Sequence, residues 1–175
     1  MEIEDERRKE MILRVSRALP EHPDLEGLLD FISREIKQML GTEGALVILL
    51  DEEKQELYFL GAAYDDTERE RRAKEIRFGL DELTAGRVIR TGEPVIVNDT
   101  TRNAKDYPER DRRFGYRTRN FLLVPLRSGD RIIGVLGALN IKAGRFNQAH
   151  VDLLTMLAGT VSLSIENARY ADEVR

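Results

Sequence analysis

Two apolar stretches late in the chain flank a short polar turn in the way that a β-hairpin requires. The stretches are residues 121–126 and 131–140, and the turn between them is Arg127-Ser128-Gly129-Asp130. Both stretches are rich in the aliphatic and β-branched residues of strands, and Ser, Gly and Asp favour tight turns. Gly134 and Gly137 allow a neighbouring element to approach the second strand closely. The pattern predicts a buried hairpin.

A second hairpin is predicted earlier in the chain by the same reasoning. Residues 45–50 form an unbroken aliphatic run, 51–56 are polar, and 57–63 are again mostly apolar. Two further short apolar stretches, 76–78 and 95–97, predict short strands at the edges of the same sheet.

Helices are predicted where apolar residues recur at intervals of three and four. These stretches are about 5–19, 25–40, 80–90, and a last one from near Phe146 onward. Gly41 is a typical helix stop because glycine adopts the left-handed conformation without strain. The charged run 65–75 indicates either a solvated loop or a helical turn.

Composition places the chain among globular proteins and removes several kinds of chemistry. Its 175 residues suit one domain, with 41% hydrophobic and 34% charged residues. No aliphatic run approaches the roughly 18 residues needed to cross a bilayer, and the acidic amino terminus lacks the apolar core of a secretory signal, so we expect a cytoplasmic protein. The absence of cysteine excludes thiol nucleophiles, redox pairs and thiolate metal sites.

A basic, irregular segment between 99 and 119 is the most distinctive part of the surface. It carries seven Lys or Arg residues against four Asp or Glu, in a chain of net charge −4, and it includes Tyr107, Phe114 and Tyr116. Such a mixture suits a segment that closes over an anionic or aromatic small ligand, and a plain solvated loop stays open as the alternative. The interspersed acids weaken the field that nucleic acid would need, so no nucleic-acid partner is expected.

Several motifs together resemble those of the GAF domain family, the small-molecule sensor modules of signalling proteins. The stretch 86–99 is similar to the family's short helix, Thr-Gly-x-Pro turn, short strand and Asp. The other matching motifs are Leu123-Val124-Pro125-Leu126, Ile133-Gly134-Val135-Leu136, Phe146 and Ile165-Glu166-Asn167-Ala168. The resemblance covers roughly residues 25–170. It implies an α+β fold with a central antiparallel sheet of about six strands, the first and last helices on one face, and the irregular segment over a pocket on the other.

The chain also departs from particular members of that family. Cyclic-nucleotide-binding members carry an Asn-Lys pair, then Phe, then Asp four residues later, whereas here Ile141 separates Asn140 from Lys142 and His150 stands four after Phe146. The methionine-sulfoxide reductases and the bilin photoreceptors of the family use cysteines that this chain lacks. His150 is interpreted as a helix-terminal residue, with a haem ligand as the less favoured alternative, and no metal is expected. The cofactor is left unknown.

We therefore expect three parts along the chain. Residues 1–20 form an N-terminal signalling or dimerisation helix, 21–170 a GAF-type sensory domain, and 171–175 the start of a linker helix to an output domain outside this sequence. That output domain is expected to be a histidine kinase of a two-component system, a cyclic-dinucleotide enzyme or a transcription activator.

The predicted function is non-catalytic sensing of a small molecule, since the sequence has neither a Gly-rich phosphate loop nor the surroundings of a nucleophilic serine. The alternatives are a ligand-free structural dimerisation module and, less favoured, a small-molecule enzyme. The expected ligand-binding residues are Asn98, Asp99, Tyr107, Phe114, Tyr116, Phe121, Leu122 and Val124, although capping of the next turn is the favoured role of Asn98 and Asp99. A homodimer is expected through the terminal helices, with Ile12, Val15, Leu19, Leu154, Leu157, Val161 and Ile165 at the interface.

Overall fold

The computed structural model describes residues 6, 9–10, 13, 24–64, 66–103, 112 and 117–174, with side chains up to residue 168 in the last helix. The helix expected at about 5–19 therefore lies outside the described residues for most of its length. The helices have the bounds α2 Leu25–Leu40, α3 Thr67–Glu75, α4 Thr84–Thr91 and α6 Gln148–Val174, with a 3₁₀ turn η1 at Thr100–Asn103. The strands are β1 Thr42–Asp51, β2 Glu56–Ala63, β3 Arg77–Gly79, β4 Val95–Val97, β5 Phe121–Ser128 and β6 Arg131–Ile141.

The six strands form one antiparallel sheet in the order β3-β2-β1-β6-β5-β4. Both expected hairpins are present, as β1–β2 and β5–β6, and they join through the pairing of β1 with β6 in the middle of the sheet. The three-residue strands β3 and β4 lie at the two edges. The predicted α+β class with a six-stranded antiparallel sheet is confirmed.

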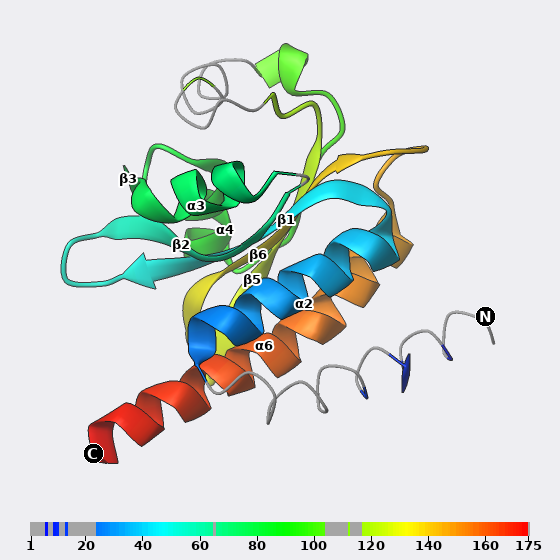
Figure 1. Cartoon of the computed structure of the whole chain (residues 1–175). Coiled ribbons are helices and arrows are strands. Elements are labelled where there is room, and N and C mark those ends of the chain that lie inside the picture. The colour runs from blue at the N-terminus through cyan, green and yellow to red at the C-terminus, as the bar shows by residue number, and fades with distance from the viewer. Residues whose placement is uncertain are drawn as a thin grey trace.

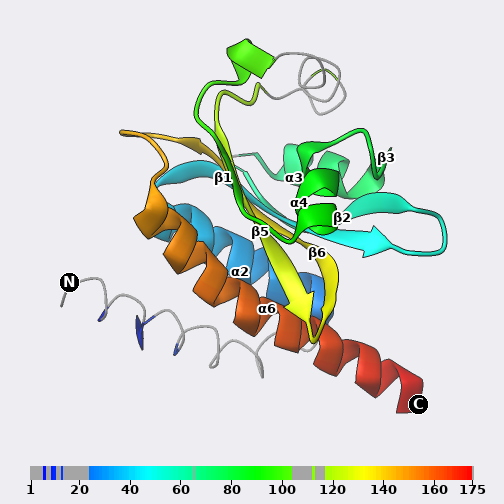
Figure 2. The same cartoon turned by 180° about the vertical axis from the view of Figure 1, so that it is seen from behind.

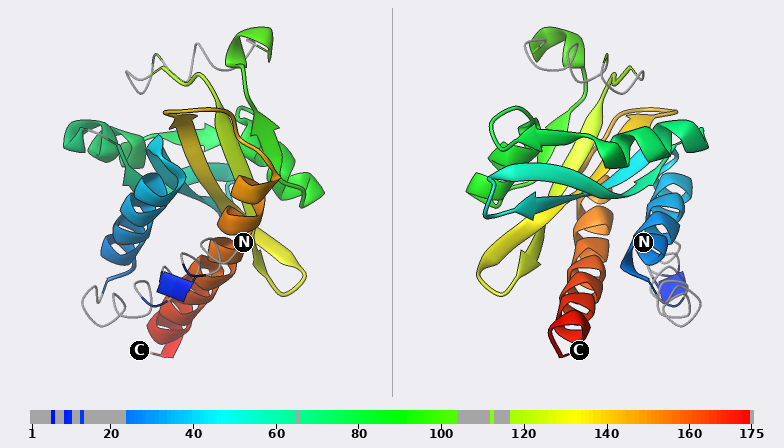
Figure 3. Two further views of the ribbon diagram at one scale, coloured as in Figure 1. Left: turned by 90° about the vertical axis from the view of Figure 1, so that its right-hand side faces the viewer. Right: turned by 60° about the vertical axis from the view of Figure 1, so that its left-hand side comes forward.

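The first and last described helices, α2 and α6, cover one face of the sheet, which we call the helical face (Figures 1 and 3). Their apolar stripes meet inward side chains of β1, β5 and β6 in one cluster that includes Leu29, Ile36, Val124, Leu154 and Ile165. Burial of these stripes stabilises both helices, because packing of an apolar face supplies most of the stability of a helix in a folded protein. The expected placement of the terminal helices on one face is confirmed.

The opposite face of the sheet carries α3 and α4 over a second apolar cluster (Figure 2). Phe59 and Phe78 meet edge to face at 5.9 Å between ring centroids, and Ala73 of α3 and Val88 of α4 are fully buried beside them. Of the charged run 65–75, residues 67–75 are thus a helix with a single buried alanine, in which the other side chains are exposed or half-buried. The helix expected over 80–90 begins only at Thr84.

Local signals explain where the helices begin and end. The carboxylate of Asp24 accepts a hydrogen bond from the N–H of Gly27 and so caps α2, and Gly41 ends that helix in the left-handed conformation at φ 67°. Gly134 is required by close packing, because a Cβ there would overlap the carbonyl oxygen of Ile48. The predicted roles of Gly41 and Gly134 are confirmed.

Candidate functional site

Asn140, near the end of strand β6, organises the ends of the irregular segment. Its side chain is fully buried, and its backbone has a positive φ of 53°. The N–H groups of Arg119 and Asn120 donate to its Oδ1 at 2.6 and 3.2 Å, and its Nδ2 donates to the carbonyl oxygen of Arg117 at 2.8 Å. Asn120 reciprocates, because its Oδ1 accepts from the N–H of Ile141 at 2.9 Å. One side chain therefore holds the backbone of three residues, Arg117, Arg119 and Asn120, just before β5 begins.

The start of the segment is tied to the same place through Thr100. Its hydroxyl donates to the carbonyl oxygen of Thr118 at 2.7 Å, and its N–H donates to the carbonyl oxygen of Arg119 at 3.0 Å. Both threonines are buried. The two ends of the segment thus meet in one buried polar cluster, which we call the loop base: Thr100, Arg117, Thr118, Arg119, Asn120 and Asn140.

Asn98 and Asp99 precede the loop base, and both accept hydrogen bonds from backbone N–H groups: Asn98 from a distant residue, and Asp99 from the turn that follows it. The Oδ1 of Asn98 accepts from the N–H of Phe146 at 3.1 Å and so joins the end of β4 to the chain that enters α6. The Oδ1 of Asp99 accepts from the N–H and the hydroxyl of Thr101 at 3.0 and 2.6 Å, which caps η1. The capping role that the sequence favoured for Asp99 is confirmed.

The structure separates the three aliphatic and aromatic residues expected on β5. Phe121 lies in the apolar cluster of the opposite face, whereas Leu122 and Val124 lie in the cluster of the helical face. Successive side chains of a strand point to opposite faces, so neighbours cannot line one cavity. Of these three, only Phe121 lies on the α3 and α4 side. Tyr107, Phe114 and Tyr116 are outside the described residues.

The residues expected at a dimer interface divide in a similar way. Ile12, Val15 and Leu19 lie outside the described residues. Leu154, Leu157, Val161 and Ile165 are at most 1% exposed and pack in the chain's own core. The sheet uses that stripe of α6, so the structure assigns these four residues to the interior of a single chain. The outward side of α6 instead shows Leu163, which is 62% exposed.

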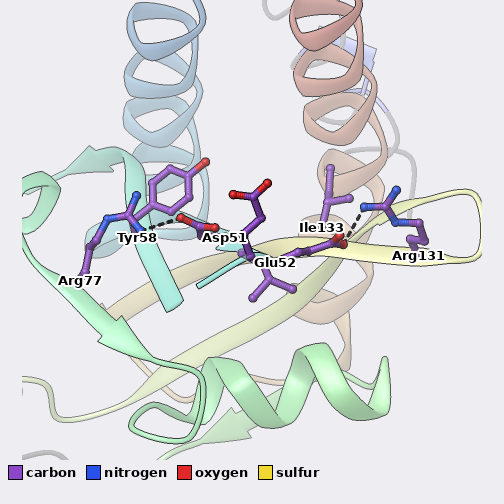
Figure 4. Close-up of a pocket in the computed structure, with 8 residues that line it drawn as sticks. Asp51, Glu52, Tyr58, Arg77, Arg131 and Ile133 are labelled. Atoms are coloured by element: carbon purple, nitrogen blue, oxygen red, sulfur yellow. Dashed lines mark hydrogen bonds and ion pairs between the residues drawn. The ribbon is translucent and has the colours of Figure 1, made fainter. Parts of the chain in front are cut away.

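A hollow of about 280 Å³ opens where the ends of the two hairpins meet β3 (Figure 4). Its lining residues are Leu50, Asp51, Glu52, Glu53, Tyr58, Arg77, Arg131 and Ile133. Arg77 pairs with Asp51 at 2.9 Å and with Glu56 at 3.3 Å and lies over the ring of Tyr58 at 4.9 Å, and Arg131 pairs with Glu52 at 2.6 Å. We call this the hairpin-end hollow.

Charges in the hairpin-end hollow already neutralise one another in part. The hydrogen bond from Arg77, supported by one from the N–H of Lys54, lowers the pKa of Asp51. The hydrogen bond to Asp51 in turn raises the pKa of Arg77. Because each arginine already contacts a carboxylate, an anion would have to displace one of these pairs. Sequence reasoning missed this hollow; the acid-rich turn 51–56 opposite two arginines was the available signal.

His150 supports the entry into α6. Its Nδ1 accepts from the N–H of Asn147 at 2.9 Å, while the Oδ1 of Asn147 accepts from the N–H of Ala149 at 2.9 Å. Its ring also meets Phe146 edge to face at 5.7 Å. This reciprocal arrangement is a helix cap. In the part of the chain that the structure describes, no group of three or more His, Asp or Glu side chains is placed to hold a metal ion.

Comparison with known proteins identifies the family to which this fold belongs. Residues 22–166 match the family model described as a GAF domain, and the chain therefore belongs to the GAF domain family. No described helix combines the length and apolar character that crossing a membrane requires.

Relatives among curated proteins are much longer than this chain. It is 28% identical over 102 residues to the probable 3',5'-cyclic phosphodiesterase pde-5 of Caenorhabditis elegans, covering 58% of this chain and 14% of that protein. It is 22% identical over 168 residues to the formate hydrogenlyase transcriptional activator FhlA of Escherichia coli strain K12, covering 94% of this chain and 24% of the activator. The chain therefore spans a quarter or less of these two relatives.

Among solved structures, the fold is similar to that of the GAF domain from a phosphoenolpyruvate-protein phosphotransferase of Coxiella burnetii. The TM-score is 0.78 at 17% identity, over 95% of this chain and 96% of that one. At this identity the likeness shows a shared fold. Together with the family match it makes the chain a GAF domain, a type of sensory module in signalling proteins.

Proposed function

We propose that this GAF domain binds a small molecule on the side of the sheet that carries α3 and α4, next to the loop base, and relays its occupancy through α2 and α6 to an output domain. The observation that supports the location most is the loop base itself. Burying Asn140 and two threonines to hold both ends of one segment is costly unless every polar group is paired, and the network pairs them. Phe121 lies on the same side, at the start of β5.

The length of α6 supports the proposed relay. This helix has 27 residues, which at 1.5 Å per residue span about 40 Å, and it runs past the edge of the sheet in Figure 1. A ligand can shift such a module only by binding two of its states with different affinity. The activator and the phosphodiesterase among the relatives support an output domain that regulates transcription or cyclic-nucleotide turnover, with a histidine kinase as a further candidate.

A thermal-shift and native mass spectrometry screen tests this function. The probes are cyclic nucleotides, amino acids, purines and haem, each as a separate class. A ligand at 100 times its dissociation constant should stabilise the fold by about 2.7 kcal/mol. Thr100→Val should weaken that shift, whereas Thr155→Val, at an exposed position of α6 away from the loop base, should leave it unchanged. If no class of probe binds the protein or raises its melting temperature, the proposal is contradicted.

The alternative of a ligand-free dimerisation module is favoured by one observation on α6. Leu163 is exposed, Met156 is half-buried, and no atom of the described residues lies within 4 Å of where a Cβ on Gly159 would stand. These three residues follow one line of the helix at spacings of three and four. Such a line permits two helices to pack closely. An interface between copies would therefore use this outward line.

Sedimentation equilibrium decides between a monomer and this dimer. Leu163→Glu should abolish association while the chain stays folded, and Thr155→Glu, at another exposed position of α6, is the matched control. Leu157→Glu is unsuitable as a test because Leu157 is 1% exposed and its replacement would disrupt the core. A wild-type protein that is monomeric at high micromolar concentration would rule out the dimer.

A further inference from the structure

Among the described residues, no strand pairs with the end of β2 on its outer side. β3 pairs with β2 only from Glu56 to Tyr58, and α3 packs against β2. Beyond that pairing, the N–H of Ala62 donates to Asp30 Oδ1 of α2 at 3.1 Å, and the N–H of Tyr64 donates to Glu70 Oε1 of α3 at 3.0 Å. Side chains from one helix of each face thus supply the acceptors that a strand would otherwise provide.

Lys74 joins these two helices directly. Its Nζ lies 2.6 Å from Asp30 Oδ2 and 2.8 Å from Glu26 Oε1, which stand four residues apart on α2. The side chains of Lys74 and Asp30 are only 20% and 22% exposed. Burial lowers the pKa of Lys74, but the hydrogen bonds to Asp30 and Glu26 outweigh it and raise that pKa overall. The lysine therefore stays charged and bound to two successive turns of α2.

A second connection runs through the backbone of Tyr64. Its N–H binds Glu70 of α3, and its carbonyl oxygen accepts from Lys37 Nζ of α2 at 3.3 Å. The ring of Tyr64 packs in the cluster of the opposite face, where Ala73 of α3 is also buried. α3 thus packs against the apolar cluster of the opposite face, while its Lys74 binds α2, the helix that covers the helical face.

We propose that Lys74, with Asp30 and Glu26, is a clasp that couples α3 to the first half of α2, so that loosening α3 also loosens α2. The inference deepens the proposed function, on which it rests, by naming a route from the α3 and α4 side to the helical face around the edge of the sheet. Coupling of this kind is a free energy shared by two elements, and it is measurable in the chain without a ligand.

Native-state hydrogen exchange of the full chain provides the measurement. Arg71→Gly weakens α3 at a side chain that is 71% exposed and lies 3.7 Å from the carboxylate of Glu68, which is exposed as well. Glycine at an exposed helix interior should speed exchange of α3 amides about fivefold. Arg87→Gly, an equivalent exposed change on α4, is the control for loss of global stability. We expect the amides of residues 28–33 in α2 to speed up several-fold more with Arg71→Gly than with Arg87→Gly.

Lys74→Met then tests whether the clasp carries that response. In this background, adding Arg71→Gly should still speed α3 about fivefold but should leave α2 no faster than the Arg87→Gly control. If Lys74→Met does not fold, Glu26→Gln replaces it, because this change removes one exposed carboxylate of the clasp. In that background, Arg71→Gly should speed the exchange of α2 amides less than it does in the wild type. Equal effects of the two glycine variants on α2, or a response that persists without the clasp, would overturn the proposal. A negative ligand screen, in contrast, would reject the sensory function and leave this result standing.

Discussion

The loop base and the hairpin-end hollow are both polar, yet they differ in burial and in charge. At the loop base, Asn140, Thr100 and Thr118 are at most 6% exposed, and their hydrogen bonds join neutral groups. At the hollow, the Arg131–Glu52 pair joins full charges whose side chains are 66% and 54% exposed. A buried polar group that loses its partner cannot form a hydrogen bond to water instead, whereas an exposed charge remains solvated. The neutral network should therefore matter more to the fold than the ion pairs do.

Asn140→Ala should have the largest effect, because it leaves two N–H groups and one carbonyl oxygen without their partner in a partly buried place. We expect a loss of about 2 to 4 kcal/mol in the free energy of unfolding, measured by urea denaturation. Asn140→Gly tolerates the φ of 53° and removes the same bonds, so it should cost about 1 kcal/mol less than alanine. A loss below about 1 kcal/mol for both variants would contradict the importance of the network.

Thr100→Val should have the next largest effect. Valine keeps the shape and removes only the hydroxyl that donates to Thr118, so the unfolding free energy should fall by about 1 to 2 kcal/mol. Thr101→Val provides the exposed comparison and should change stability by less than about 0.5 kcal/mol. Equal effects at the two positions would show that burial does not separate them.

The pH dependence of stability tests the ion pair of Asp51 in the hairpin-end hollow. Its pKa in the folded chain lies below the ordinary value of 3.8, chiefly through the hydrogen bond from Arg77, so its contribution to stability is present above that value and is lost as the pH falls through the lower one. The difference in unfolding free energy between wild type and Asp51→Asn should therefore shrink from neutral pH toward about pH 2. A difference that stays constant over this range would exclude the ion pair as its source.

Arg131→Gln should have the smallest effect. The pair with Glu52 is exposed, and we expect a loss below about 0.5 kcal/mol that disappears in about 1 M salt. Denaturation of the variant and the wild type at low and high salt checks this. A loss as large as that of Thr100→Val would reverse the ranking of the two regions.

Some features followed from the sequence because their causes are local. The hairpin β5–β6 was predictable from two aliphatic stretches around Ser-Gly-Asp, and α2 from its stripe and Gly41. The run 65–75 was ambiguous because only Ala73 is buried, and a single apolar residue carries no periodic signal. The family motifs added the sheet of six strands and the packing of the terminal helices.

The amino-acid sequence by itself determined most of the elements and, through its family motifs, the fold class, since these depend on periodicity, turn residues and motifs close together along the chain. Only the tertiary structure decided which residues share a place. It put Phe121 and Leu122 on opposite faces, used Leu154 and Leu157 for the core, and brought Asn140 to a segment about twenty residues earlier. The physical reason is that strand pairing and sheet faces bring together or separate side chains irrespective of their distance in sequence.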